Sequence, residues 1–343
     1  MDINPVILEA GARLFAVNSN DLKRLGGMDG VAYAYTQPDT GREYVLKFTP
    51  FPGFAPLGGE RIATIGAKLD FVNYLSLNGV SVAKPAASIN GAFVETLQMP
   101  DAPLPTDGQE PHEPPVYAVT SSERAPGRHV FQANEWNGEM FEEWGRIIGQ
   151  MHRLTRVYEA QRTWPDGLVG NWESELYSFG RSCKDNEVRS RWFALGDVLR
   201  SFTPTPDCYG LIHNDPHQFN FMVHRQDGVL KLTLFDFDVC AYHWFMTDIG
   251  IALYHALMAR RMEGQSALDF ASHFIDRFMR GYSRENTLDN KWLLRLPLFT
   301  SYRRMLLYMV FTHEWASPTV DQKRQLDMWR QDIINDAPVI AVD

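Results

Sequence analysis

The pattern of apolar residues changes near Gly127, and this change constrains the fold more than any other feature of the chain. Before this point, short runs rich in β-branched and aromatic residues alternate with turn residues, a pattern typical of strands. Beyond it, apolar residues recur at the spacing of amphipathic helices. The sequence therefore predicts an α+β fold of two lobes, a small β-rich lobe over residues 1–122 and a larger, mainly helical lobe over residues 123–343.

A hairpin is the clearest expected element of the first lobe. Strands over residues 31–35 and 43–48 flank the turn from Gln37 to Gly41, whose Pro, Asp and Gly favour a reversal of the chain. The other elements expected in this lobe are a helix over 61–78, strands over 91–97 and 116–120, and an exposed, proline-rich loop over 99–115.

The second lobe is expected to be mainly helical. An apolar stripe that includes Phe141, Trp144 and Ile148 predicts an amphipathic helix over residues 142–153. The other elements expected here are strands over 219–224 and 229–236, and helices over 248–260, 267–281 and 292–315.

The composition is that of an ordinary globular protein. Of 343 residues, 45% are hydrophobic and 22% are charged, which allows a sizeable core. The net charge of −9 argues against nucleic-acid binding, because that function needs a basic surface. The first residues lack the features of a signal peptide, and no apolar run approaches the roughly 20 residues that span a bilayer. Cys183, Cys208 and Cys240 are widely spaced and read as reduced thiols, which favours a cytoplasmic protein. Because the sequence also implies no export or membrane insertion, we expect no membrane partner.

Polar side chains gather just before the second hairpin and again at the end of its second strand. Apolar residues flank both groups, so their polar atoms must be paired or functional. Any one of these residues alone could be a satisfied turn or cap. Together they indicate a functional site, and they are His213, Asp215, His217, Asn220, Asp236 and Asp238.

This pattern resembles the catalytic loop and metal-binding motif of kinases, in the variant form of the aminoglycoside phosphotransferase and choline kinase family. In that family the loop runs His-Gly-Asp, four residues and Asn, and a hydrophobic strand then ends in Asp-Phe-Asp or Asp-Phe-Glu. Here the loop reads His213-Asn-Asp-Pro-His-Gln-Phe-Asn220, and Asp236-Phe-Asp238 follows. The resemblance implies a protein-kinase-like fold and an enzyme that transfers the γ-phosphate of ATP, with Mg²⁺, to a hydroxyl group of a small molecule.

Phosphoryl transfer needs a carboxylate to hold and deprotonate the acceptor hydroxyl, and oxygen ligands for the magnesium that neutralises the phosphates. The resemblance implies that Asp215 is this base and that Asn220 and Asp236 hold the metal. Three residues would support them. His213 would brace the loop, Asp238 would bind a second metal or a cationic acceptor, and Asp248 would tie the loop down or simply cap the following helix.

The resemblance also assigns nucleotide-binding roles in the first lobe. Lys47 matches the lysine that grips the α- and β-phosphates, although a lone strand lysine could equally be a surface residue. The glycine-rich turn would let the backbone approach the phosphates, and the segment near residue 121 would bind adenine through backbone groups. The residues concerned are Gly26, Gly27 and Gly30 in the turn, and Ser121, Ser122 and Glu123 in the adenine segment.

The sequence departs from the family pattern in three places. Asn214 replaces the glycine of the loop and Pro216 follows the base, so the loop's backbone could be set differently. The glutamate that should pair with Lys47 is missing at the family's spacing, where Lys68 stands, and Glu60 is the possible substitute. Beyond residue 241 no pattern identifies the acceptor.

Several alternatives remain open at this point. A metal hydrolase would use His213, Asp215 and His217 as ligands. A kinase-like scaffold would bind nucleotide without catalysis, and a serine/threonine protein kinase would use a protein acceptor. The acceptor could be an aminoglycoside, choline, homoserine or a sugar-like compound. The aromatic residues 242–245 either form a cage for a cation or belong to the core.

Overall fold

The computed structural model describes residues 3–26, 30–51, 62–98, 116–259 and 266–340. The chain divides into two compact units. The N-unit comprises Met1–Leu77 with Val82–Ala125, and the C-unit comprises Asn78–Ser81 with Pro126–Asp343. In the described ranges, no helix has both the length and the apolar character needed to cross a membrane.

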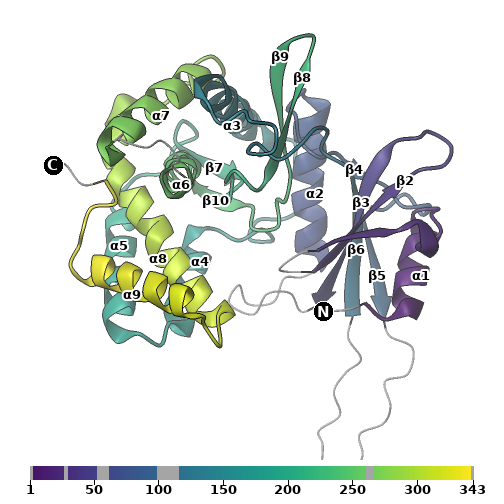
Figure 1. Ribbon diagram of the computed structural model, residues 1–343, viewed down its shortest axis with the longest axis horizontal. Coiled ribbons are helices and arrows are strands. Elements are labelled where there is room, and N and C mark those ends of the chain that lie inside the picture. Colours follow the sequence, from purple (N-terminus) through teal and green to yellow (C-terminus); the bar gives the residue numbers. More distant parts are fainter. Residues whose placement is uncertain (1–2, 27–29, 52–61, 99–115, 260–265, 341–343) are drawn as a thin grey trace, which may run out of the picture. The chain divides into compact units, whose positions relative to one another are not determined.

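An antiparallel sheet forms the centre of the N-unit, and α1 and α2 flank it (Figure 1). The strand order is β1-β2-β3-β6-β4, and β5 also pairs with β6. The elements are α1 (Pro5–Leu14), β1 (Lys23–Gly26), β2 (Val31–Thr36), β3 (Glu43–Phe51), α2 (Ile62–Leu77), β4 (Pro85–Ala86), β5 (Val94–Gln98) and β6 (Val116–Glu123).

The predicted first hairpin is confirmed, because β2 pairs with β3 from Val31 opposite Phe48 to Thr36 opposite Glu43. The helix and the two strands expected later in this lobe correspond to α2, β5 and β6. The proline-rich segment 99–115, expected to be an exposed loop, lies outside the described residues.

The two faces of this sheet differ in character because successive strand residues point to opposite sides. On β3, Tyr44, Leu46 and Phe48 are buried in the core that the sheet forms with α1. Lys47, between two of these residues, is half-buried and points to the opposite face. The strand therefore separates an apolar core face from a face that carries the predicted phosphate-binding lysine.

The C-unit is mainly helical and carries two small sheets, β7 with β10 and the hairpin of β8 with β9 (Figure 1). Its helices are α3 (Gly138–Tyr158), α4 (Trp172–Ser182), α5 (Asn186–Arg200), α6 (Phe245–Met258), α7 (Ala267–Tyr282), α8 (Leu296–Glu314) and α9 (Val320–Ile334). Its strands are β7 (Tyr209–Ile212), β8 (Phe221–Gln226), β9 (Val229–Leu234) and β10 (Ala241–Trp244).

One expected helix, over residues 292–315, is divided in two. A 3₁₀ helix covers Asn290–Arg295, and α8 begins at Leu296 with Pro297 in its first turn. Proline has no N–H and fits the first turn of a helix but not its interior. The proline therefore marks a helix start that the apolar pattern alone does not reveal.

Helices α3 and α7 pack closely because glycines face backbone across their contact. A Cβ atom on Gly145 would lie 1.9 Å from the carbonyl oxygen of Phe278, and one on Gly281 would lie 1.7 Å from that of Glu142. Neither distance is possible for real atoms, so only glycine allows the two backbones to approach this closely. The two helices therefore form a closely packed pair in the C-unit.

We expect Gly145→Ala to lower the free energy of unfolding by about 1–3 kcal/mol, because the backbones of α3 and α7 must separate. Gly66→Ala is the matched control, since Gly66 is also helical and a Cβ there meets nothing within 4 Å. The control should be neutral or stabilise by roughly 0.5–1 kcal/mol. Urea unfolding of both variants tests this, and equal effects would contradict the close packing.

Asp185 connects three helices of the C-unit. Its Oδ1 accepts hydrogen bonds from the N–H groups of Glu187 and Val188 at the start of α5. Its Oδ2 accepts from Arg330 Nε of α9 at 2.6 Å and from the Tyr308 hydroxyl of α8 at 3.1 Å. Burial alone would raise the pKa of this carboxyl, but the hydrogen bonds from Arg330, Val188 and Tyr308 outweigh it and lower the pKa.

A carboxyl with a lowered pKa stabilises the folded state fully above its unfolded pKa, and this contribution disappears as the pH falls through the folded pKa. We therefore expect Asp185→Ala to cost about 1–2 kcal/mol at pH 7, including the lost helix cap. The difference from wild type should stay constant down to about pH 5 and shrink below the ordinary aspartate pKa of 3.8. Urea unfolding across this pH range measures it, and a pH-independent difference would be the contrary result.

Candidate active site

The polar loop of residues 213–220 joins β7 to β8, and one buried carboxylate holds its start. Asp248 of α6 accepts hydrogen bonds from the N–H groups of His213, at 3.2 Å, and Asn214, at 2.8 Å. Burial lowers the pKa of His152, so its ring is neutral and donates from Nε2 to Asp248 at 3.0 Å. The residue at the N-cap of α6 is Trp244, so the alternative that Asp248 only caps this helix is wrong.

Asn214 adopts the backbone conformation that glycine favours, with a φ of 65°. Asparagine tolerates this left-handed region better than most residues. Its side-chain amide donates to Glu175 Oε2 at 2.8 Å and to the Val239 carbonyl at 3.1 Å. The departure from the family's glycine is therefore compatible with a glycine-like backbone, and it adds two anchors to the loop.

His213 is fully buried, and both of its ring nitrogens are engaged. Nε2 donates to the carbonyl oxygen of Phe235 at 3.1 Å, and Nδ1 accepts from the N–H of Asp215 at 3.3 Å. Burial lowers the pKa of His213, so the ring is neutral. This geometry contradicts the metal-hydrolase alternative, and no cluster of three metal-ligating side chains occurs in the described ranges. His213 connects the loop to the residue before Asp236.

The Asp215 carboxylate is three-quarters buried and surrounded by donors. Oδ1 accepts a hydrogen bond from Arg303 Nη2. Oδ2 accepts from Asn220 Nδ2 at 3.2 Å and lies 3.3 Å from His217 Nε2. Burial alone would raise the pKa of Asp215, but the positive charge of Arg303, with the contribution of His217, lowers it well below its usual range. The carboxylate is therefore ionised at neutral pH and can accept a proton or a hydrogen bond.

Asn220 and Asp236 lie at the two ends of the β8–β9 hairpin. Phe221 pairs with Leu234, and the N–H of Phe235 donates to the Asn220 carbonyl at 3.0 Å, which brings the two residues together. The Asn220 amide nitrogen donates to Asp215, so the amide oxygen points away from that carboxylate. One amide oxygen and one carboxylate form a donor set that suits Mg²⁺, which takes few protein ligands and completes its shell with phosphates and water.

The residues after Asp236 belong partly to the core. Asp238 is half-buried in a turn, and its expected role in binding a second metal or a cation stays a prediction. Residues 242–244 lie in β10, and His243, Trp244 and Phe245 are buried. The proposed aromatic cage for a cation is therefore wrong, and the alternative of core packing holds.

Two of the nucleotide-binding residues expected in the N-unit, Lys47 and Gly26, lie in strands of the sheet. Lys47 stands between Ala32 of β2 and Thr120 of β6. Gly30 allows a close approach of backbones, since a Cβ there would lie 2.5 Å from the Phe48 carbonyl oxygen. Gly26 is the last residue of β1. Gly27 and Glu60 lie outside the described residues, and so does the pairing of Glu60 with Lys47.

The segment expected to bind adenine is part of β6. The Ser121 hydroxyl is 2.9 Å from that of Tyr35, and Ser122 pairs with Val45 and Pro85. The N–H of Glu123 donates to the Lys84 carbonyl at 2.8 Å. Because this backbone contact uses the N–H of Glu123, that group is not available to adenine.

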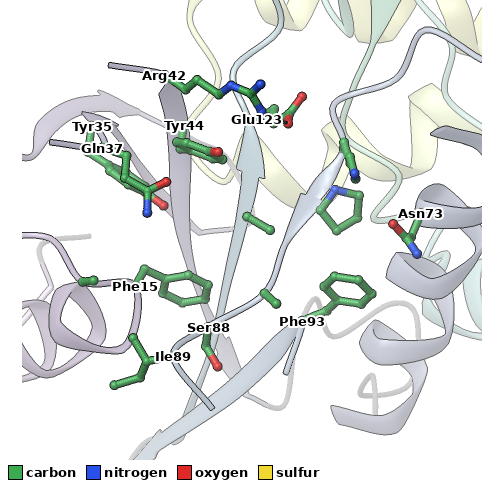
Figure 2. Close-up of a pocket in the computed structure, with 15 residues that line it drawn as sticks. Phe15, Tyr35, Gln37, Arg42, Tyr44, Asn73, Ser88, Ile89, Phe93 and Glu123 are labelled. Atoms are coloured by element: carbon green, nitrogen blue, oxygen red, sulfur yellow. Dashed lines mark ion pairs between the residues drawn. The ribbon is translucent and has the colours of Figure 1, made fainter. Parts of the chain in front are cut away.

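A cavity of about 620 Å³ lies within the N-unit (Figure 2). Phe15, Tyr35, Tyr44 and Glu123 are among its lining residues, and the two tyrosine rings stack with centroids 5.4 Å apart. Tyr44 points to the face of the sheet opposite to Lys47. Lys47 is not among the residues that line the cavity.

Three residues near Asp215 did not emerge from the sequence pattern. They are Arg303, His255 and Glu175, which come from α8, α6 and α4. Arg303 lies next to Arg304 within an apolar helix, and buried charges of this kind require partners. This pair of arginines is the signal that could have indicated a polar site in the C-terminal third.

Comparison with known proteins agrees with this geometry. The phosphotransferase enzyme family matches residues 22–288. An amicoumacin kinase of Bacillus subtilis (strain 168) is 31% identical over 343 residues, which cover 98% of this chain and 94% of that protein. An amicoumacin kinase solved in complex with AMP-PNP, Ca²⁺ and Ami superimposes with a TM-score of 0.83 at 30% identity, covering 100% of this chain and 96% of that one.

A more distant structure shares the fold. A microcompartment-associated aminopropanol kinase has a TM-score of 0.70 at 19% identity, covering 97% of this chain and 96% of that one. The chain belongs to the phosphotransferase enzyme family. It is an ATP-dependent kinase that acts on a small molecule, and its fold is of the protein-kinase-like type that the family resemblance implied.

Proposed function

We propose that this kinase transfers the γ-phosphate of ATP, bound with Mg²⁺, to a hydroxyl group of amicoumacin or of a closely similar compound. One observation carries the choice of acceptor. The identity of 31% with an amicoumacin kinase extends over 98% of this chain, and so includes the C-terminal segment beyond the family match at residue 288. The aminopropanol kinase covers a similar share of this chain but at 19% identity, so the higher identity over the full length, and not the coverage alone, supports amicoumacin.

In this proposal the two predicted lobes have separate tasks. Residues 1–122 bind the nucleotide, with the glycine turn and Lys47 at the phosphates and the Ser121 segment at adenine. Residues 123–343 bind the acceptor and carry the catalytic loop. Mg²⁺ neutralises phosphate charge when it is bound, and Asn220 and Asp236 supply its oxygen ligands.

Asp215 is the residue that meets the acceptor in this mechanism. Its ionised carboxylate accepts a hydrogen bond from the hydroxyl group, orients the oxygen for in-line attack and takes up the proton. Asp248 and His213 keep the loop in place through the contacts described above, so that the carboxylate need not reorganise during transfer.

The acceptor is tested directly by mass spectrometry of purified protein with ATP, Mg²⁺ and a panel of acceptors. The panel contains amicoumacin, choline, 1-amino-2-propanol, an aminoglycoside and a generic protein substrate. We expect amicoumacin to gain one phosphoryl group with the highest kcat/KM. A higher kcat/KM with another small molecule would replace the proposed acceptor, while the assignment to the kinase family would stand.

A pair of variants separates the base from the metal ligand. Asp215→Asn should cut kcat by about 10²–10⁴ with little change in nucleotide affinity, because the base acts on the acceptor and not on ATP. Asp236→Ala should also abolish the rise in melting temperature that ATP and Mg²⁺ produce by mass action. Asp321→Asn, at a side chain that is 91% exposed, is the control and should match wild type. The same loss of nucleotide binding in both variants would contradict the two roles.

A further inference from the structure

Arg303 is a buried arginine whose charge meets the carboxylate proposed as the base. Its side chain is 6% exposed, and Nη2 donates to Asp215 Oδ1. Removing a guanidinium group from water is strongly unfavourable unless a well-placed anion compensates. The ion pair with Asp215 supplies this compensation, although the two residues are 88 positions apart in the chain.

His255 of α6 holds the guanidinium group from a second side. Its Nε2 lies 3.0 Å from Arg303 Nε and 2.8 Å from Arg303 Nη2. Burial and the positive charge of Arg303 lower the pKa of His255, so the ring is neutral and Nε2 accepts. The His255 ring also lies 4.7 Å from that of His217, which faces the same aspartate. Arg303 is therefore fixed between α6 and the loop.

The donors around Asp215 leave one position for an acceptor. An ionised carboxylate offers about four lone-pair sites, two on each oxygen. His217 Nδ1 accepts from the N–H of Phe219 at 3.1 Å, so Nε2 carries the proton that faces Oδ2. Oδ2 thus meets two donors, His217 and Asn220. Among the described residues, Arg303 is the one whose side chain donates a hydrogen bond to Oδ1. One lone pair of Oδ1 therefore remains for a hydroxyl group.

We propose that Arg303, held by His255, is a positioning residue that turns Asp215 Oδ1 toward the acceptor hydroxyl. This inference rests on the proposed role of Asp215. During transfer the acceptor oxygen bonds to the γ-phosphorus and its proton passes to Asp215. The bond from that phosphorus to the β,γ-bridging oxygen breaks, and ADP leaves with the electron pair. Without Arg303 the carboxylate can rotate, and a misplacement of about 1 Å can cost roughly 10² in rate.

Kinetics of Arg303→Met, Arg303→Lys and Arg304→Met test the proposal. Arg304 is the matched control, because it is equally buried and adjacent on α8, yet it bonds the Ala337 carbonyl and pairs with Asp332. We expect Arg303→Met to lower kcat about 10²-fold with ATP affinity within about threefold of wild type. Arg303→Lys should recover part of kcat, since an ammonium group reaches Asp215 but lacks the second contact with His255.

Arg304→Met should lower the melting temperature and keep kcat per folded molecule within about threefold of wild type. An equal loss of kcat in Arg303→Met and Arg304→Met would overturn the proposal, because it would indicate a general packing effect. Wild-type kcat in Arg303→Met would overturn it as well. If Arg303→Met does not fold, Arg303→Lys takes its place in the comparison with Arg304→Met. A kcat of Arg303→Lys below that of Arg304→Met supports the proposal, and an equal kcat overturns it.

A double-mutant cycle shows whether Arg303 acts through Asp215. In an Asp215→Asn background, Arg303→Met should lower kcat less than about threefold. The reason is that both substitutions remove the same function, the oriented carboxylate of Asp215. The same 10²-fold loss in both backgrounds would overturn the proposal.

Wild-type protein that phosphorylates none of the acceptors would overturn the proposed function instead. Crystal structures of the nucleotide-bound wild type and Arg303→Met would then decide on Arg303. A different orientation of the Asp215 carboxylate in Arg303→Met than in the wild type supports the inference. The same orientation in both structures overturns it.

Discussion

The arrangement of the site depends on the fully buried carboxylate of Asp248. A charge removed from water must be compensated by hydrogen bonds, and here the donors are two backbone N–H groups of the loop and the neutral ring of His152. Because two of the three donors belong to the backbone, they hold the start of the loop regardless of its side chains. The positions of His213 and Asp215 relative to α6 follow from this attachment.

The β8–β9 hairpin then fixes the proposed metal ligands, Asn220 and Asp236, relative to the start of the loop. His213 bonds the carbonyl of Phe235, and the N–H of Phe235 bonds the carbonyl of Asn220, so the residue before Asp236 touches both ends of the loop. The proposed base and the proposed ligands are therefore connected by hydrogen bonds within one segment of 24 residues, from 213 to 236. This compactness explains why spacing along the sequence is informative for this part of the site.

Local spacing predicted the elements whose partners are near in sequence. The first hairpin, the loop and its motif, and the long helix of residues 142–153 are of this kind. Helices α4 and α5 escaped prediction, although their N-caps, Asn171 and Asp185, are typical cap residues. The environment of Asp215 could not be predicted from spacing, because Arg303 and His255 come from distant helices and only packing brings them together.

Two consecutive residues of α8, Tyr302 and Arg303, support the catalytic loop. The contribution of Tyr302 depends on Asn214, which stands where the family has glycine. Tyr302 donates to Glu175, whose other oxygen accepts from the Asn214 amide, while Arg303 bonds Asp215 directly. Burial raises the pKa of Glu175, even though both hydrogen bonds favour its charged form. A glycine at position 214 has no side chain to donate, so Glu175 would lose a partner in a buried place. Asn214, Glu175 and Tyr302 therefore form a hydrogen-bonded unit that connects the catalytic loop of this protein to α4 and α8.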